Sequence, residues 1–346
     1  HGLMGWCMQA LQWLNNLPLA VWTQHAPPPW SIVLGMLGVA WVLLPRGFPT
    51  RWLGALLLLP MFLVQQEPLP PASARLTIFD VGQGLAVAVQ TRQHTLLYDS
   101  GPAFNSEADS GNRILVPSLR GMGIATLDTL VLTHDDSDHT GGALSVLQAM
   151  PVGSLLSSLP KDSPIVQQAT STRRCADGDN WEWDGVRFEL LHPAADSYAQ
   201  EDNISTNNLG CVLRISTGAY SVLLAADIEK ESERRLLQQH ADKLRATLLV
   251  VPHHGSKTSS TPAFVSAVRP QYAVFTAGYR NRFGHPKAEV VERYRASGST
   301  LLRSDEDGAI LVKMDALHFD VERYRQRHVR YWQQQPGPVD LAQPPE

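Results

Sequence analysis

Two histidines and three carboxylates lie within one ten-residue stretch of this sequence, THDDSDHTGG at positions 133–142. The stretch follows an apolar run at 130–132 that predicts a buried strand, and it precedes an apolar run at 143–147 that predicts a helix. Carboxylates and imidazoles crowded at such a turn cost free energy through repulsion and desolvation unless a cation lies among them. The pattern therefore predicts a metal site; the alternative is a solvated acidic turn with two incidental histidines.

Further residues suited to acid–base chemistry or metal binding follow other predicted strands. They are Asp99, Asp227, His253, His254 and His285. Taken alone, an aspartate such as Asp227 would more often cap a helix, and a single histidine would more often be an ordinary buried or exposed side chain. Each of these residues, however, comes after an apolar run, and functional residues commonly gather at one end of a packed sheet. We therefore expect them to lie close to the 133–142 stretch.

The elements that must position these residues are strands mixed with helices. Apolar or alternating runs predict a hairpin at 181–188, a helix at 228–239, and strands at 76–79, 86–89, 95–98, 211–215, 221–224, 248–251 and 273–275. Hairpins combined with strand–helix units favour two sheets sandwiched between helices. The sequence therefore predicts a layered α/β domain in its second part.

The composition of the 346-residue chain limits the classes of function. Hydrophobic residues make up 44% and charged residues 18%, which favours membrane contact for part of the chain. The net charge of -4 provides no global basic field for a nucleic-acid partner. Cys7, Cys175 and Cys211 lack the spacing of metal ligands, and we expect all three to be free or buried. The chain begins with His1, so we expect it to be a fragment.

Residues 1–66 are nearly free of charge and predict a membrane region. Two apolar runs at 30–44 and 52–64 contain no ionisable residue and have tryptophans near their ends, and the connection between them holds Arg46 and Arg51. Each run is shorter than the ~20 residues of an upright transmembrane helix, so a buried hairpin is the alternative. By the positive-inside rule, the connection would face the cytoplasm and the chain beyond residue 64 would lie outside it.

Two segments flank these apolar runs. Apolar residues recur at helical spacing within residues 4–17, which indicates a helix that lies at the membrane interface or packs against other parts of the protein. Residues 67–74 are rich in proline and indicate a linker to the α/β domain.

The order of the polar sites resembles that of the metallo-β-lactamase fold. That family has an Asp-x-Gly turn, an H-x-H-x-D-H motif, a third histidine, a Gly-Asp pair after a strand and a last histidine. The matching residues here are Asp99, His134, Asp138, His139, Asp227 and His254. The segments DVGQG at 80–84, LTHDDSDHTGG at 132–142, PHHGS at 252–256 and FGHP at 283–286, with Asn207-Asn208, more specifically resemble the ComEC family of competence proteins.

The ComEC resemblance implies a fold, a setting and partners. The fold would be an α/β metallo-β-lactamase-like αββα sandwich at 75–335. An amphipathic helix and two transmembrane helices, the end of a membrane competence domain, would precede it at 1–66, and a flexible tail would follow at 336–346. The protein would lie in the bacterial inner membrane, with this domain in the periplasm. Its partners would be DNA, the membrane, the rest of the channel polypeptide and other competence proteins.

The sequence departs from the broad family at three positions. Asp136 stands at the second histidine of the motif, Asn208 stands at the third histidine, and Ala226 replaces the usual glycine. Carboxylate-rich sites suit harder cations such as Mn²⁺, whereas imidazole suits Zn²⁺. We expect Mn²⁺ or Zn²⁺, either two ions bridged by one aspartate or one ion held by a smaller set. The expected ligands are His134, Asp136, Asp138, His139, Asp227 and His254.

The favoured function is metal-dependent cleavage of DNA phosphodiester bonds, degrading the strand that is not transported. A bound cation would lower the pKa of a water, Asp136 and Asp138 would act beside it, and His253 or His285 would protonate the leaving oxygen. The expected substrate contacts are Asp99, Asn207, Asn208, Ser256, Arg280, Arg282 and Lys287. The alternatives are a non-catalytic DNA-guiding module with a degenerate metal site, and a hydrolase of small esters or lactones on the same fold.

Overall fold

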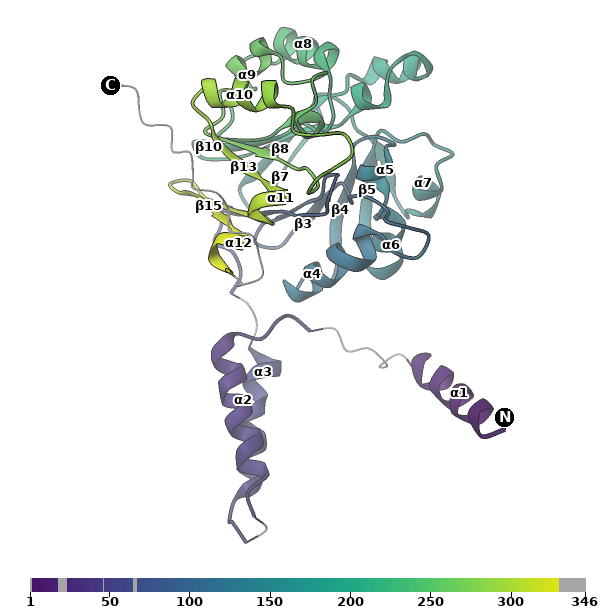
Figure 1. Ribbon diagram of the computed structural model, residues 1–346, viewed down its shortest axis with the longest axis vertical. Helices are drawn as coiled ribbons and strands as arrows, with labels where there is room; N and C mark the ends of the chain where they lie inside the picture. The colour runs from purple at the N-terminus through teal and green to yellow at the C-terminus, as the bar shows by residue number, and fades with distance from the viewer. Residues whose placement is uncertain (1, 18–23, 46, 65–66, 330–346) are drawn as a thin grey trace. The chain divides into compact units, whose positions relative to one another are not determined.

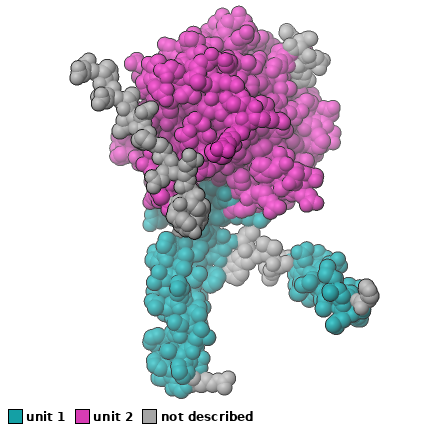
Figure 2. All heavy atoms as spheres, in the orientation of Figure 1, with its two compact units in different colours: residues 1–67, 118–124 teal, residues 68–117, 125–346 magenta. Residues whose placement is uncertain are grey.

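The computed structural model describes residues 2–17, 24–45, 47–64 and 67–329, which fall into two compact units (Figures 1 and 2). The first unit comprises residues 1–67 together with 118–124, and the second comprises residues 68–117 and 125–346. The predicted tail at 336–346, the last residues of the predicted α/β domain and Arg46 lie outside the described residues.

The first unit is helical. Its elements are α1 (Gly2–Asn15), α2 (Pro29–Val42), the 3₁₀ helix η1 (Arg51–Leu58) and α3 (Leu59–Leu63). The chain folds back so that α2 packs against η1 and α3, and two glycines lie at the crossing. A Cβ atom on Gly38 would come within 2.5 Å of the Gly54 carbonyl oxygen, and one on Gly54 within 2.6 Å of the Gly38 carbonyl oxygen. Only glycine permits this approach of the two backbones.

The two predicted transmembrane helices are not supported. No helix among the described residues is long and apolar enough to cross a membrane. The run at 30–44 forms the 14-residue α2, and the run at 52–64 is divided between η1 and α3. A 14-residue helix is about 21 Å long, less than the ~30 Å hydrocarbon core of a bilayer. α1 forms where the helical spacing predicted it, and none of its residues is buried.

Two sheets form the framework of the second unit, as the sequence predicted. The first sheet has the strand order β15 (Phe319–Arg323), β14 (Ile310–Met314), β1 (Ala74–Ile78), β2 (Val87–Gln90), β3 (Thr95–Tyr98), β4 (Leu127–Leu132), β5 (Val152–Ser157) and β6 (Thr172–Arg174). The second has the order β13 (Thr300–Arg303), β12 (Tyr272–Phe275), β11 (Leu248–Val250), β10 (Tyr220–Leu224), β9 (Val212–Thr217), β8 (Val186–His192) and β7 (Asn180–Trp183).

Helices connect the strands of the second unit. Those from the first half are η2 (Gly111–Leu115), α5 (Ser137–Thr140), α6 (Ala143–Ala149) and α7 (Pro164–Gln168), while most of α4 (Val116–Gly121) falls within the 118–124 segment of the first unit. Those from the second half are η3 (Ala195–Asn203), η4 (Thr206–Leu209), α8 (Lys230–Gln239), η5 (Pro252–Gly255), α9 (Pro262–Val268), α10 (Ala288–Ala296), α11 (Ser304–Asp307) and α12 (Tyr324–Arg327).

Two apolar cores lie on either side of the second sheet. Side chains alternate along a strand, so Leu213 of β9 packs in the core between the two sheets, while its neighbour Val212 packs in the core under the helices. Tyr98 and Phe188 are among the largest side chains of the inner core. The outer core is closed by α8, α9 and α10, which lie over the outer face of the second sheet (Figure 1).

Parallel pairing in both sheets gathers the strand ends that carry the polar residues. β3 pairs in parallel with β4, and β10 pairs in parallel with β11. Asp99 and His134 therefore leave the first sheet at the same edge, and Asp227 and His254 leave the second sheet at the same edge. The sheets face one another across the inner core, so the two sets of loops can meet above it.

Candidate metal centre

Four side chains from three loops meet at these strand ends. The Nε2 atom of His139, in the loop after β4, lies 3.2 Å from Asp227 Oδ1 and 3.3 Å from His254 Nε2. His254 Nε2 in turn lies 3.2 Å from Asp138 Oδ2 and 3.4 Å from Asp227 Oδ2. His139, Asp227 and His254 are buried, and Asp138 remains partly exposed. The cluster thus has a closed side within the protein and one side open to solvent.

Two overlapping groups in this cluster have the spacing of metal ligands. One consists of Asp138, His139 and His254, and the other of His134, His139 and Asp227. Within each group the candidate ligand atoms lie within 4.8 Å of one another. Imidazole and carboxylate donors in such an arrangement suit Zn²⁺ or Mn²⁺.

The chemistry of the cluster fits a cation. Among the buried polar atoms that lack a hydrogen-bond partner in the described residues are His134 Nε2 and Asp227 Oδ1. Leaving such atoms unpaired costs on the order of 1–3 kcal/mol each. The Nε2 atoms of His139 and His254 also lie 3.3 Å apart, and at most one of them can donate a hydrogen bond to the other. A divalent ion among these atoms would give each of them a partner.

Asp99 orients two of the histidines. Its carboxylate accepts a hydrogen bond from His139 Nδ1 at 2.7 Å and two from Thr133, through the backbone amide at 2.8 Å and the hydroxyl at 2.9 Å. The Thr133 hydroxyl oxygen lies 2.9 Å from His134 Nδ1 and accepts from it. Both histidines therefore present Nε2 to the centre. Asp99 is completely buried, so its carboxylate reaches these candidate ligands but is not exposed for the substrate contact predicted for it.

His254 is oriented in the same manner by a residue that the sequence did not identify. Its Nδ1 lies 3.1 Å from the hydroxyl of Thr276, which follows β12, and its Nε2 points toward Asp138 and Asp227. A threonine after a strand carries no distinctive pattern, so only the folded structure reveals this contact.

The charges in the cluster stabilise one another. Burial alone lowers the pKa of His254, but the Asp227 carboxylate and the hydrogen bond with Asp138 raise it to about 9. Burial has the same effect on His139, yet Asp227 and Asp99 hold its pKa well above the usual value. Burial would raise the pKa of Asp138, but its contacts with His254 and His139 lower it to about 2. Without a cation, protons on the imidazoles balance the carboxylates.

Several residues at these strand ends adopt the left-handed backbone conformation. Asp99 has φ 56°, Ala226 49°, His253 52° and His254 53°. For residues other than glycine this region costs roughly 1–3 kcal/mol each and is found preferentially at functional sites. Ala226 stands where the resembled family has glycine. Its positive φ explains the family's glycine, because glycine adopts this backbone conformation without strain. These turns aim the candidate ligands; other non-glycine residues with positive φ, such as Asp184 and Arg269, lie elsewhere in the chain.

Asp136 lies at the mouth of the cluster rather than inside it. Its side chain is 44% exposed, and its Oδ2 lies 3.7 Å from His134 Nε2. Its Oδ1 accepts a hydrogen bond from the Thr206 hydroxyl at 3.1 Å. The neighbouring His134 imidazole lowers the pKa of Asp136, so the group is ionised at neutral pH. It belongs to neither group with ligand spacing.

The predicted proton donors differ in their surroundings. His253 Nε2 lies 3.9 Å from Asp227 Oδ2, and its Nδ1 lies 3.1 Å from the Thr258 hydroxyl. His285 packs edge-on against His253, with 6.0 Å between ring centroids. Burial, followed by the neighbouring His254 and His253 charges, lowers the pKa of His285 to about 4. His285 is therefore neutral near pH 7, which makes it a poor proton donor and leaves His253 as the candidate.

The side chain of Asn208 anchors the start of a helix. Asn208 Oδ1 accepts hydrogen bonds from the Glu229 amide at 3.2 Å and the Ser232 hydroxyl at 2.9 Å, at the start of α8. Its Nδ2 donates to Glu229 Oε2 at 3.3 Å. Asn207 is buried. These hydrogen bonds give Asn208 the role of holding the start of α8.

The remaining predicted substrate contacts divide between a buried and an exposed set. Ser256 is buried and lies 3.2 Å from the Thr258 hydroxyl. Arg280 and Arg282 are exposed on the loop that follows β12, and Lys287 donates to the Phe283 carbonyl oxygen at 2.6 Å. These three cations lie on the same loop as His285.

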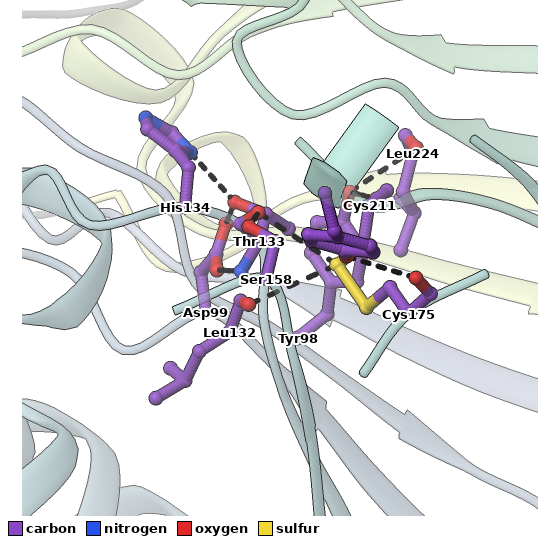
Figure 3. Close-up of a disulfide and its surroundings, with 10 residues drawn as sticks. Tyr98, Asp99, Leu132, Thr133, His134, Ser158, Cys175, Cys211 and Leu224 are labelled. Atoms are coloured by element: carbon purple, nitrogen blue, oxygen red, sulfur yellow. Dashed lines mark hydrogen bonds between the residues drawn. A yellow bond between two sulfur atoms is a disulfide. The ribbon is translucent and has the colours of Figure 1, made fainter. Parts of the chain in front are cut away.

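A disulfide joins the two sheets beside the cluster (Figure 3). Cys175, directly after β6, is bonded to Cys211, directly before β9, and both are completely buried. The Cys211 amide donates to the Thr133 carbonyl oxygen at 3.3 Å, and the Tyr98 hydroxyl donates to the Cys211 carbonyl oxygen at 2.6 Å. Cys175 and Cys211 are buried, which is one of the two states that the sequence predicted, but the sequence did not predict the bond between them. Cys7 is free and exposed.

Comparisons with known proteins agree with this geometry. Residues 79–278 match the metallo-beta-lactamase superfamily. The chain is 36% identical over 334 residues to Competence protein ComA of Neisseria gonorrhoeae, an alignment that covers 96% of this chain and 45% of that protein. It is 29% identical over 337 residues to ComE operon protein 3 of Bacillus subtilis, covering 88% and 43% respectively.

Among solved structures, the metallo-beta-lactamase fold protein YhfI of Bacillus subtilis matches with 12% identity and a TM-score of 0.44, over 70% of this chain and 100% of that chain. The chain spans less than half the length of the two competence proteins. Because the family match covers more than half of the chain, the chain belongs to the metallo-β-lactamase superfamily, and it is a homologue of these competence proteins, as its resemblance to the ComEC family predicted.

Proposed function

We propose that the second unit is a metal-dependent phosphodiesterase that acts on DNA, within a protein of natural competence. The observation that carries this proposal is the buried set of Nε2 and carboxylate atoms that have ligand spacing and include two unpaired atoms, His134 Nε2 and Asp227 Oδ1. The names of the competence homologues favour DNA as the substrate. In this proposal the domain degrades the strand that is not transported.

The ligand set proposed here omits Asp136, which the sequence analysis included. Asp138, His139 and His254, with Asp227 beside them, would hold one divalent ion, and His134 with Asp227 Oδ1 would hold a second. The ion supplies an acidified water and charge for the phosphoryl oxygens when it is bound. Every other task falls to side chains of the protein.

Two residues at the open side of the cluster are placed for proton transfer. Asp136 is ionised and partly exposed next to His134, so its carboxylate can accept a hydrogen bond from the attacking water and orient it. His253 lies on the far side of Asp227, with one ring nitrogen toward that carboxylate and the other toward Thr258. In this arrangement His253 Nε2 donates a proton to the oxygen that leaves phosphorus.

The compartment is a second part of the proposal. Disulfides form and persist in oxidising compartments, so the buried Cys175–Cys211 bond supports a position of this unit outside the cytoplasm. In the first unit, large apolar side chains such as Met36 (69% exposed) and Trp52 (67% exposed) favour contact with lipid or with other parts of the polypeptide. The proposed setting is the bacterial inner membrane, with the metal cluster on its outer side.

A membrane-impermeant thiol reagent tests this topology in intact cells. A cysteine placed at Leu317, which is 76% exposed on the second unit, should react before lysis. Reaction only after lysis would contradict the proposed side.

A substrate screen tests the proposed activity against its two alternatives. The purified chain, reconstituted with Mn²⁺ or Zn²⁺, is incubated separately with single-stranded DNA, duplex DNA, a small phosphodiester and a lactone. The proposal expects cleavage of DNA and of the phosphodiester but not of the lactone. Lactone hydrolysis alone would establish the small-molecule alternative. Metal binding without cleavage of any substrate would favour the DNA-guiding module.

A further inference from the structure

The loop from Gly278 to Lys287 exposes two aromatic rings beside the metal cluster. Tyr279 is 64% exposed and Phe283 is 45% exposed. Exposed aromatic side chains lose the free energy that burial of their apolar surface would provide. The chain nevertheless places both on one short loop, four residues apart. No step of the proposed phosphodiesterase chemistry uses either ring.

A cation accompanies each ring. The guanidinium carbon of Arg280 lies 5.2 Å from the centroid of the Tyr279 ring, and that of Arg282 lies 4.8 Å from the centroid of the Phe283 ring. Residues 279–287 contain three cationic side chains and no carboxylate. Within the described residues neither arginine forms an ion pair, so both guanidinium groups remain available to an anion. The loop is therefore locally basic on a chain whose net charge is -4.

The loop is held in one conformation by its own hydrogen bonds. The side-chain amide of Asn281 donates to the carbonyl oxygens of Gly278 at 2.9 Å and His285 at 2.6 Å, and its oxygen accepts from the His285 amide at 3.0 Å. Lys287 closes the far end through its bond to the Phe283 carbonyl oxygen. Rings on such a preorganised loop lose little conformational freedom when a ligand binds.

The start of the loop packs closely on the 80–84 segment. A Cβ atom on Gly278 would lie 2.6 Å from the Gln83 amide nitrogen, and the Gly278 amide donates to Gln83 Oε1 at 3.2 Å. Glycine is required at this approach, which fixes where the loop leaves the domain.

A row of rings connects Phe283 with the metal cluster. Phe283 stacks on His285 with 5.8 Å between centroids and 22° between planes. His285 lies 6.0 Å from His253, and His253 lies 6.4 Å from His254. At the ~3.4 Å rise per nucleotide of a stacked strand, these steps correspond to a separation of only a few nucleotides. A strand held at Phe283 thus extends as far as the cluster.

We propose that Tyr279 and Phe283 form a stacking platform for unpaired bases of a single-stranded nucleic acid, with Arg280 and Arg282 binding the adjoining phosphates. Aromatic rings interleaved with cations are the combination that binds single strands without reading their sequence. The bases of a duplex are already stacked on one another and offer no free faces to the rings. The inference rests on the proposed phosphodiesterase function and specifies its substrate as a single strand.

Binding without cleavage tests the platform. The full chain in detergent, freed of metal by a chelator, is titrated against labelled oligothymidine and against an abasic oligonucleotide of the same length. Tyr279→Ala and Phe283→Ala should each weaken oligothymidine binding roughly 5- to 150-fold. Neither should change binding of the abasic strand, which keeps the phosphates and lacks the bases. Phe283→Trp should retain the affinity, and Tyr324→Ala, which removes an exposed ring elsewhere, should leave it unchanged.

The arginines require a different readout. Arg282→Ala should weaken binding of both strands and reduce the dependence of affinity on salt by about one phosphate contact. Arg234→Ala, at an exposed arginine of α8, is the matched control. Oligouridine in place of oligothymidine shows whether the sugar matters; the stacking contribution of the rings should be the same in both.

Two results would overturn the platform. One is wild-type affinity for oligothymidine in both alanine variants. The rings would then not bind nucleic acid, and contact with a protein partner would become their better explanation. The other is an equal loss for the oligothymidine and abasic strands, which would mean that the rings only support the loop. Cleavage is measured separately after metal is restored. DNA cleavage with no effect of the rings on binding would refute the platform alone, and ring-dependent binding without cleavage would refute the phosphodiesterase alone.

Discussion

The carboxylate of Asp99 and the imidazole of His139 form a completely buried pair, with 2.7 Å between Asp99 Oδ2 and His139 Nδ1. Through the Thr133 hydroxyl the same carboxylate also orients His134. One side chain at the end of β3 thus fixes the donor direction of two histidines in the loop after β4. Their Nε2 atoms are presented to the cluster without direct solvent contact.

Replacement of Asp99 should weaken metal binding although Asp99 is not a ligand. Asp99→Asn retains the shape but removes the charge and one acceptor atom, so both imidazoles lose part of their orientation and basicity. We expect affinity for Zn²⁺ or Mn²⁺ to fall about 10- to 100-fold, measured by titration calorimetry. Asp128→Asn is the matched control, because Asp128 accepts from His94 Nδ1 and the Thr95 amide elsewhere in the same sheet. Equal affinity of Asp99→Asn and the wild type would contradict the proposed role.

The stability of the metal-free chain should fall as the pH rises. The pKa of His254 is raised from 6.5 to about 9 in the folded state, so its contribution to stability is fully present below pH 6.5 and is lost as the pH passes through about 9. Melting curves in chelator between these values should therefore show a decreasing Tm. His254→Gln should flatten this dependence. A Tm that rises steadily over the same interval would contradict the charge arrangement described here.

Metal binding should release protons over the same interval. A cation at Nε2 of His139 or His254 displaces the proton held there, so the apparent affinity should increase with pH between about 7 and 9. Titration calorimetry in buffers of different ionisation enthalpy counts these protons. A proton count of zero at pH 7 would show that the cation binds elsewhere.

The disulfide should contribute substantially to stability. The bond closes a loop with a sequence separation of 36, for which chain entropy predicts about 4 kcal/mol. Cys175→Ser combined with Cys211→Ser should lower the free energy of unfolding by roughly this amount in denaturant titrations, and reductant should have the same effect on the wild type. Cys7→Ser, at an exposed free cysteine, should change nothing. A double variant as stable as the wild type would contradict this estimate.

Replacement of Asp136 should lower the rate of catalysis without lowering the affinity for metal. Its partial exposure and its absence from the groups with ligand spacing indicate that it orients water and does not hold the metal. Asp136→Ala should therefore keep the metal affinity while the rate of phosphodiester cleavage falls about 100-fold. A loss of affinity equal to the loss of rate would instead make it a ligand, the other role that the sequence allowed.

The sequence predicted the strand ends well because the pattern that marks them involves residues close together in the chain. The run at 95–98 is β3 itself, and the apolar runs before Asp227 and His254 are β10 and β11. Each of these runs is largely apolar, and a polar residue follows within three positions, which is the pattern of a buried strand that ends in a functional loop. The candidate ligands therefore followed from residue types that stand next to each other in the chain.

What the sequence did not reveal depends on contacts between distant residues. β14 pairs with β1 across more than two hundred residues, and Thr276 meets His254 only because β12 lies beside β11. The bond between Cys175 and Cys211 likewise requires β6, at the edge of the first sheet, to lie close to β9, inside the second sheet. Asp99 was assigned to substrate because its position in the motif indicates proximity to the site, whereas its burial is a property of the packed structure.

The most direct test of the central claim is DNA cleavage by the metal-loaded chain and by two ligand variants. With Mn²⁺ or Zn²⁺ at saturation, the wild type should degrade DNA. Asp138→Asn and Asp227→Asn should lose roughly hundred-fold or more of the rate, because a neutral amide is a weaker ligand than a carboxylate. Circular dichroism confirms that each variant is folded. Intact DNA after incubation with folded wild-type chain, shown by elemental analysis to contain the metal, would contradict the account.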